Sequence, residues 1–230
     1  MNLQENLTRL EDRIAQACAR AGRRRTEVLL VAVSKTQPTE VIRAAYDLGI
    51  RDFGENRVQE LLKKKDYLPD DIRWHLIGHL QSNKAKYVAP FIRYVHSIDS
   101  IETAIELSKR ARQSSRLIDV LLEINVAGEA SKEGIAVSEC KPLLELIFEQ
   151  APSIRVRGLM TVAPFEPDAQ LVRPYFRELR KLRDELALAE LSMGMTNDFE
   201  VAIEEGATMI RLGSALFGSR PAAGQTVSNL

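Results

Sequence analysis

Lys35 is the residue in this sequence best suited to covalent chemistry, because it follows a largely apolar run, VLLVAVS, at positions 28–34. Such a run is typical of a strand that is buried on both faces in a parallel sheet. A lysine at the end of that strand would have a packed stem and an amine at the rim of the sheet, where burial disfavours the ammonium form. Uncharged lysine amines form imines with carbonyl compounds. By position alone, a side chain that simply extends into water is an equal alternative.

Two turns late in the sequence could hold a phosphate group. Thr196-Asn197 and Gly213-Ser214 each stand between a predicted strand and a predicted helix. The free N–H groups and the dipole at a helix N-terminus attract anions, and phosphate sites of α/β barrels recur after the last two strands. Asn197 and Ser214 are also ordinary N-cap residues, so neither turn alone indicates more than capping. Together, the two turns favour the imine-forming role of Lys35.

The spacing does not support other chemical motifs. The segment SKT at 34–36 lacks the glycines that a nucleotide phosphate loop needs before its Lys-Thr pair. His75, His79 and His96 are not arranged as a metal motif, and no Gly-x-Ser-x-Gly elbow for serine catalysis is present. We therefore predict no metal site and assign no catalytic residue, and we expect the histidines to be structural or to form a polar lining.

A regular alternation of strands and helices must position these residues. Strands are predicted at 28–34, 51–54, 74–78, 94–98, 118–126, 154–160, 191–195 and 208–212, each followed by a helix. An amphipathic helix within residues 1–22 precedes the first strand. Asp99 with Glu102, and Asn197 with Glu200, have the spacing of capping boxes and predict where two of the helices begin.

Eight such units predict an α/β fold in which parallel strands close into a (β/α)8 barrel of the TIM type, with an extra N-terminal helix. A doubly wound open sheet is the alternative, but the Gly-x-Gly-x-x-Gly turn that usually follows its first strand is absent. No linker interrupts the chain, so we predict a single domain over residues 1–230 with a flexible tail at 219–230. The loop at 127–134 is expected to be mobile.

The composition is that of an ordinary globular protein. Of 230 residues, 28% are charged and 45% are hydrophobic, and 32 basic residues balance 32 acidic ones. A neutral chain has no overall field that would attract nucleic acid or an anionic membrane, and its apolar runs are too short to span a bilayer. Cys18 and Cys140 lack the spacing of a zinc or redox pair. We expect a cytoplasmic protein that binds neither nucleic acid nor a membrane.

Five segments, in this order, carry a resemblance to a known family. They are VAVSKTQP at 31–38, FGENRVQE at 53–60, HLIGHLQSNK at 75–84, GLMTVAP from Gly158, and SMGMTNDFE from Ser192 continuing to IRLGSALFG. With these segments the chain resembles the pyridoxal phosphate homeostasis protein family, barrel relatives of the alanine racemase N-terminal domain with the type III fold of pyridoxal 5′-phosphate (PLP) proteins. The resemblance covers nearly the whole chain.

The resemblance implies roles for individual residues. It places PLP on Lys35 as a covalent aldimine and the pyridine nitrogen of PLP opposite Arg211. It assigns the phosphate to Thr196, Gly213 and Ser214. Four further residues in family-like segments are candidates for lining the pocket, namely Asn56, Met160, Ser192 and Met195. His79 and Asn83 lie in a shared segment, but their residue types do not indicate a role.

The resemblance also implies a function: a carrier that holds PLP as a Schiff base and takes part in intracellular PLP and vitamin B6 homeostasis, with little or no catalysis. Such a carrier could release PLP to PLP-dependent apoenzymes. The alternative is a PLP-dependent racemase, which needs a second acid or base opposite the lysine. In related racemases a tyrosine of the partner subunit provides it through an additional β domain, and without that domain we expect a monomer. A class I aldolase is a third possibility, but its lysine usually lies on strand six, which here has none.

Overall fold

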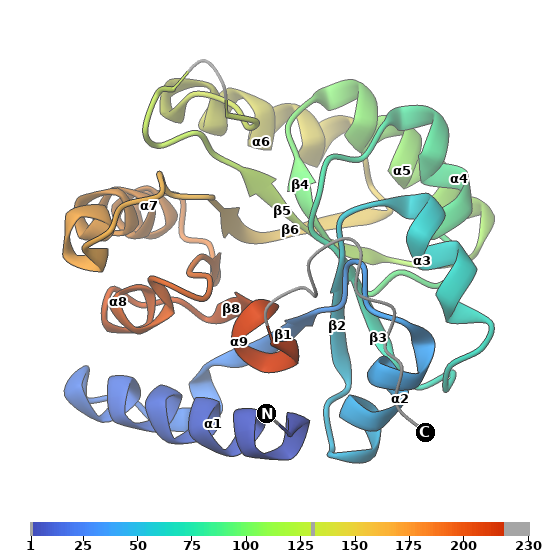
Figure 1. The fold of residues 1–230 in the computed structure, drawn as a ribbon. Helices are drawn as coiled ribbons and strands as arrows, with labels where there is room; N and C mark the ends of the chain where they lie inside the picture. Colours follow the sequence, from blue (N-terminus) through green and yellow to red (C-terminus); the bar gives the residue numbers. More distant parts are fainter. Residues whose placement is uncertain (1, 130–131, 219–230) are drawn as a thin grey trace.

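Eight parallel strands close on themselves in sequence order in the computed structural model, which describes residues 2–129 and 132–218 (Figure 1). The strands are β1 (Leu29–Val33), β2 (Asp52–Glu55), β3 (Arg73–Leu76), β4 (Tyr94–Ile98), β5 (Ile118–Glu123), β6 (Ile154–Met160), β7 (Glu190–Ser192) and β8 (Met209–Leu212). The barrel closes where β1 pairs with β8, with Leu29 opposite Met209 and Ala32 opposite Leu212. The predicted (β/α)8 barrel is confirmed. The predicted tail at 219–230 and positions 130 and 131 of the predicted mobile loop lie outside the described residues.

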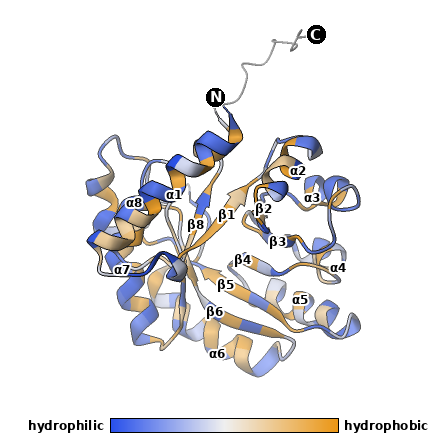
Figure 2. Ribbon diagram, turned by 90° about the horizontal axis from the view of Figure 1, so that it is seen from below, coloured by the Kyte–Doolittle hydropathy of each residue, from blue (hydrophilic) through white to orange (hydrophobic). Residues whose placement is uncertain are grey.

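Helices follow the strands and cover the outside of the barrel (Figure 1). They are α1 (Leu3–Arg20), α2 (Thr39–Asp47), α3 (Val58–Lys65), α4 (Ala85–Val88), α5 (Ile101–Gln113), α6 (Cys140–Gln150), α7 (Arg173–Glu185), α8 (Phe199–Glu204) and α9 (Ser214–Phe217). Strands β1 and β5 are largely hydrophobic, whereas the helices mix polar and apolar residues (Figure 2). No helix in the described part of the chain is both long enough and apolar enough to cross a membrane.

The extra N-terminal helix α1 packs beside α8 and α9, as Figure 1 shows. Its apolar stripe is buried at Leu10 and Ile14, and the amide of Asn6 donates a hydrogen bond of 2.9 Å to the backbone oxygen of Leu216. Salt bridges such as Arg13 to Glu200, at 2.9 Å, lie at the edge of this interface. The helix therefore covers the part of the barrel where the first and last strands meet.

Three predicted helix starts are wrong. α5 is capped by Ser100, whose hydroxyl accepts from the N–H of Thr103, rather than by Asp99. α8 begins after Asp198, one residue beyond the predicted cap Asn197, and Ser214 is the first residue of α9 rather than its cap. Polar residues adjoin the starts of α5 and α8, and Gly213 precedes Ser214 at the start of α9. The backbone conformation decides which of them is the cap, and sequence spacing does not reveal it.

Some strands are also shorter than predicted, because the chain turns before the apolar pattern ends. β7 ends at Ser192, and two residues later Gly194 has φ +94°, a left-handed conformation that strands do not contain. β1 ends at Val33, since the backbone oxygen of Ser34 accepts from the N–H of Gln37 at 3.0 Å and forms a turn. These turns place Lys35 and Met195 on loops beyond the ends of their strands.

Candidate functional site

A cavity of about 450 Å³ lies at the carboxyl ends of the strands. Its wall includes residues that follow β1, β2, β6, β7 and β8, together with apolar side chains such as Val33, Ile77 and Val172. Because the strands of the barrel are parallel, their carboxyl ends meet on one face, and residues that are distant in sequence converge there. The predicted residues Lys35, Asn56, Met195, Thr196, Arg211, Gly213 and Ser214 all line this cavity.

Lys35 stands on the turn that follows β1. The prediction that its stem is packed by the barrel is wrong, because the strand ends at Val33 and the side chain of Lys35 is exposed. The side chain nevertheless forms part of the cavity wall. Its amine is therefore accessible to a ligand without displacement of the core.

The hydroxyl groups of Thr196 and Ser214 meet in the same cavity. Their oxygens are 3.1 Å apart and share a hydrogen bond, although the residues are 18 positions apart in sequence. Ser214 opens α9. The N–H groups of Leu216 and Phe217 donate to the backbone oxygen of Gly213, which leaves the first two N–H groups of α9 without an intrahelical partner. The two hydroxyls and these N–H groups form a donor-rich corner of the kind that binds phosphate oxygens.

Arg211 is buried beneath the cavity and is held by fixed acceptors. One guanidinium nitrogen, Nη1, donates to the backbone oxygen and the hydroxyl of Ser192 at 2.7 and 2.6 Å, and Nη2 donates to the backbone oxygen of Thr161 at 2.8 Å. Burial lowers the pKa of Arg211 to about 10, so the group remains charged at neutral pH. These bonds use three of the five N–H groups of a guanidinium, which leaves two for a ligand.

A chain of buried side chains continues from Arg211 through the barrel. The hydroxyl of Ser192 lies 2.9 Å from Nδ1 of His96, Nε2 of His96 lies 2.9 Å from Nδ1 of His75, and Nε2 of His75 lies 3.1 Å from Oδ1 of Asp52. Burial lowers the pKa of both histidines. Burial opposes ionisation of Asp52, but hydrogen bonds from Arg73 and His75 outweigh it and bring its pKa to about 2.

The two ends of this chain fix the direction of every hydrogen bond within it. An ionised Asp52 can only accept and Arg211 can only donate. His75 must therefore donate to Asp52, His96 to His75, and Ser192 to His96, while Arg211 donates to Ser192. The network is satisfied with both histidines neutral, and both are fully buried.

Two of the predicted pocket residues lie elsewhere. Ser192 is fully buried and supports Arg211 from behind rather than lining the cavity. Met160 packs in a buried cluster with Tyr94, Leu121 and Met209. In both cases the side chain on the strand points into the barrel interior, below the cavity. The inward direction is set by strand register, which the residue type does not indicate.

His79 and Asn83 take no part in the cavity. His79 Nδ1 lies 3.1 Å from a carboxylate oxygen of Asp99, and Asn83 is exposed. Across residues 2–129 and 132–218, no group of three or more His, Cys, Asp or Glu side chains is arranged to hold a metal ion.

Sequence reasoning missed a buried carboxyl group, Glu123, and a buried ion pair between Lys64 and Glu55 near the mouth of the barrel. Burial raises the pKa of Glu123, at the end of β5, to about 7, and its Oε2 atom has no hydrogen-bond partner in the described structure. Lys64 of α3 is buried against Glu55 and Glu60. Glu60 and Lys64 are four residues apart on a helix, and this spacing could have indicated their ion pair.

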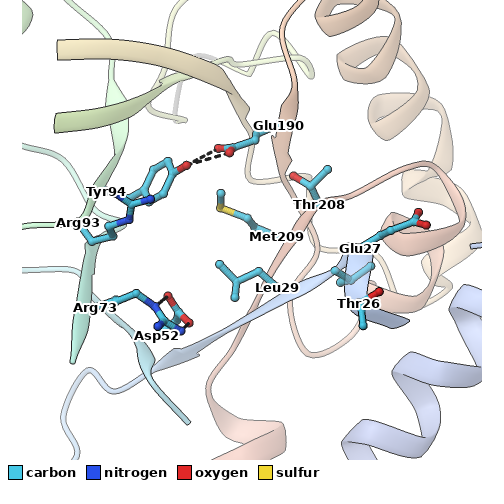
Figure 3. Close-up of a pocket in the computed structure, with 11 residues that line it drawn as sticks. Thr26, Glu27, Leu29, Asp52, Arg73, Arg93, Tyr94, Glu190, Thr208 and Met209 are labelled. Atoms are coloured by element: carbon cyan, nitrogen blue, oxygen red, sulfur yellow. Dashed lines mark hydrogen bonds and ion pairs between the residues drawn. The ribbon is translucent and has the colours of Figure 1, made fainter. Parts of the chain in front are cut away.

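A second cavity, of about 330 Å³, lies at the opposite end of the barrel (Figure 3). Each of its charged residues has a partner, either within the cavity wall or just outside it. Arg73 binds both carboxylate oxygens of Asp52 at 2.8 and 2.6 Å, and the hydroxyl of Tyr94 contacts both carboxylate oxygens of Glu190 at 2.8 Å. Residues at the amino ends of barrel strands generally contribute to stability, and paired charges agree with that role.

The first cavity combines an accessible amine, a pair of hydroxyls, a buried guanidinium with spare donors and an apolar wall. An amine can condense with a carbonyl group, the hydroxyls suit a phosphate, and a guanidinium donates to a neutral ring nitrogen. The arrangement therefore fits a ligand that carries an aldehyde, a phosphate group and a hydrogen-bond acceptor.

Comparisons with known proteins agree with this geometry. The profile of the family described as "Alanine racemase, N-terminal domain" matches residues 6–221. The Pyridoxal phosphate homeostasis protein of Aquifex aeolicus is 50% identical over 227 residues, which are 96% of this chain and 99% of the relative. The protein of the same name from Pseudomonas aeruginosa is 43% identical over 221 residues, 94% of this chain and 95% of the relative.

One solved structure that is similar to this chain contains a ligand. It is PipY of Synechococcus elongatus PCC7942 with PLP bound, at 37% identity and a TM-score of 0.78, and the match covers 89% of this chain and 100% of that one.

Proposed function

The chain belongs to the alanine racemase N-terminal domain family, and from that membership we propose that it binds PLP in the cavity at the carboxyl ends of its strands and acts in PLP homeostasis. The relatives named for this role cover nearly the whole chain. The observation that carries the proposal is the convergence of Lys35, the hydroxyl pair and Arg211 on one cavity. Each group suits a different part of the same cofactor.

Under this proposal each residue has one task. Lys35 binds the aldehyde carbon covalently, Thr196 and Ser214 donate to the phosphate near Gly213, and Arg211 donates to the ring nitrogen. Asn56 and Met195 contribute to the wall. Bound PLP supplies an electron-withdrawing ring conjugated to the carbon that Lys35 holds.

The chemistry of Arg211 suits holding the cofactor better than driving broad carbanion reactions. A guanidinium that remains charged donates a hydrogen bond and does not transfer its proton. The ring nitrogen opposite it would stay unprotonated, and an unprotonated ring withdraws electrons weakly. We therefore propose that the protein holds and releases PLP with little or no catalysis of its own, and that PLP-dependent apoenzymes receive it.

We further propose that residues 1–230 form one domain and that the protein works as a cytoplasmic monomer without nucleic acid. The closed barrel leaves no strand edge to pair with another chain, and the equal numbers of basic and acidic residues produce no net charge to attract nucleic acid. Cys18 and Cys140 are buried free thiols, as expected in a reducing compartment. Light scattering at micromolar concentration should give the mass of one chain, and a stable dimer would contradict this part of the proposal.

The experiment that tests the function is the spectrum of the purified protein after incubation with PLP. Wild-type protein should show the absorbance band of cofactor attached to an amine, and borohydride should fix the cofactor to Lys35. Lys35→Ala should lose both signals, whereas Lys63→Ala, which removes an exposed lysine of α3, should keep them. An unchanged band in Lys35→Ala would refute the assignment.

A further inference from the structure

The segment that carries Lys35 is strained and anchored on both sides. Residues 34–37 form a turn in which the backbone oxygen of Ser34 accepts from the N–H of Gln37 at 3.0 Å. Thr36, the third residue of this turn, has φ +64°. A β-branched residue rarely adopts a left-handed conformation, and strain of this kind persists only where surrounding contacts enforce it.

Lys64 provides one of those contacts from a separate element. Its ammonium donates to the backbone oxygen of Ser34 at 2.8 Å, to Oε1 of Glu55 at 2.8 Å and to Oε1 of Glu60 at 2.6 Å. These three acceptors match the three N–H groups of an ammonium. The side chain of Lys64 thus has a single arrangement in which all its donors are used.

The two carboxylates that Lys64 binds also form hydrogen bonds with both neighbours of Lys35. Oε1 of Glu55 also accepts from the hydroxyl of Ser34 at 2.7 Å. Oε1 of Glu60 also accepts from the backbone N–H of Thr36 at 2.5 Å. Residues 34 and 36 are therefore each held by a carboxylate that Lys64 binds at the same time, and Lys35 stands between them.

Burying the charges of Lys64 and Glu55 costs desolvation free energy, so this cluster is an inefficient way to stabilise a fold. Lys64 is only 7% exposed and Glu55 is fully buried, and Oε2 of Glu55 has no hydrogen-bond partner in the described residues. Burial raises the pKa of Glu55 against the opposing pull of Lys64 and Ser34. Apolar residues often replace a buried ion pair without loss of stability, and the best-attested benefit of keeping one is geometric specificity. What this cluster specifies is the path of the chain around Lys35.

We propose that Lys64 is a positioning residue: together with Glu55 and Glu60 it fixes the turn at 34–36 and thereby sets where the amine of Lys35 stands in the cavity. This inference rests on the proposed function, in which Lys35 binds the aldehyde of PLP. Condensation of the amine with the aldehyde forms one C=N bond and releases the carbonyl oxygen as water. Its rate depends on the placement of Nζ, and a displacement of about 1 Å can cost roughly 100-fold.

The test separates covalent capture from binding. Lys64→Met removes the ammonium and keeps most of the side-chain volume, and Lys63→Met on the exposed side of the same helix is the matched control. Two quantities are measured: the rate of borohydride-reducible attachment of PLP, and the affinity for pyridoxine 5′-phosphate, which has no aldehyde. Lys64→Met should slow attachment by at least ~10-fold and leave the affinity for the alcohol within about 2-fold, while Lys63→Met should change neither.

The outcomes distinguish this inference from the proposed function. Equal loss of both quantities in Lys64→Met would indicate a general structural role, and an unchanged attachment rate would mean that the turn is held without Lys64. Either result overturns the inference while Lys35→Ala still loses the band. If Lys64→Met does not fold, Glu60→Ala replaces it, since Glu60 is partly exposed and is the acceptor for Thr36. Glu60→Ala should slow attachment about 3-fold or more, and wild-type kinetics would overturn the inference.

Discussion

Replacing both Thr196 and Ser214 by alanine should weaken PLP binding by at least ~10-fold. Each hydroxyl is proposed to donate to a charged phosphate oxygen, and such bonds contribute roughly 1.5 to 3 kcal/mol each. The two hydroxyls already bond to each other at 3.1 Å in the cavity, so binding replaces a neutral hydrogen bond worth about 1 kcal/mol. The net loss is then roughly 2 to 5 kcal/mol, less what nearby backbone N–H groups recover, and each 1.4 kcal/mol is tenfold in affinity.

The assay is a titration of apoprotein with PLP and with pyridoxal, which lacks the phosphate. In the double variant the affinity for PLP should fall and that for pyridoxal should barely change. Thr8→Ala, at an exposed position of α1, controls for the loss of a hydroxyl as such. Equal weakening of both aldehydes would show that the two residues shape the ring pocket or the fold, and unchanged binding of both would refute the phosphate assignment.

Three further changes test the barrel interior. The pKa of Glu123 is raised from 4.5 to about 7, so the folded state retains a proton that the unfolded chain releases. Stability therefore falls as pH rises from 4.5 to 7, by at most roughly 3 kcal/mol. Glu123→Gln should lose this slope, so that urea unfolding shows the variant gaining stability relative to wild type between pH 5 and pH 8; parallel pH profiles would contradict the assignment. A Cβ on Gly158 would lie 1.9 Å from the backbone oxygen of Glu190, so Gly158→Ala should destabilise the protein by about 3 kcal/mol, and a wild-type melting temperature would be incompatible with this packing. Ser192→Ala should lower the free energy of unfolding in urea by about 1 to 3 kcal/mol, because it leaves Nδ1 of His96 buried without a donor; an unchanged midpoint would argue against the network.

The alternation of apolar strands with amphipathic helices was enough to predict the barrel. Closure then placed residues at the carboxyl ends of the strands on one face, which is why Lys35, Thr196 and Ser214 could be assigned to one site before any contact was known. The motif resemblance added Arg211, whose position on β8 offers no chemical signal by itself. These predictions depended on the order of strands and helices along the chain and on the end of the barrel at which each loop lies. The sequence determines both.

Only the tertiary structure decided the directions in which the side chains point and the register of the strands. Met160 and Ser192 lie on strands next to the site, yet their side chains point into the interior, below the cavity. Lys35 is exposed because β1 ends two residues earlier, at a turn that Lys64 of α3 contacts. The contact between Lys64 and Ser34 joins residues 30 positions apart, so no local pattern could reveal it.

The hydrogen-bonded chain of side chains that starts at Arg211 shows most clearly what the sequence alone does not reveal. Its members come from β2, β3, β4, β7 and β8, and neighbouring side chains such as His96 and Ser192 are 96 positions apart. The sequence supplied two histidines, a serine and an aspartate with no recognisable spacing. The register of adjacent strands brings together Asp52 with His75, His75 with His96, and Ser192 with Arg211, and closure of the barrel brings His96 of β4 to Ser192 of β7 across its interior. Only burial keeps both histidines neutral so that every donor in the chain meets an acceptor.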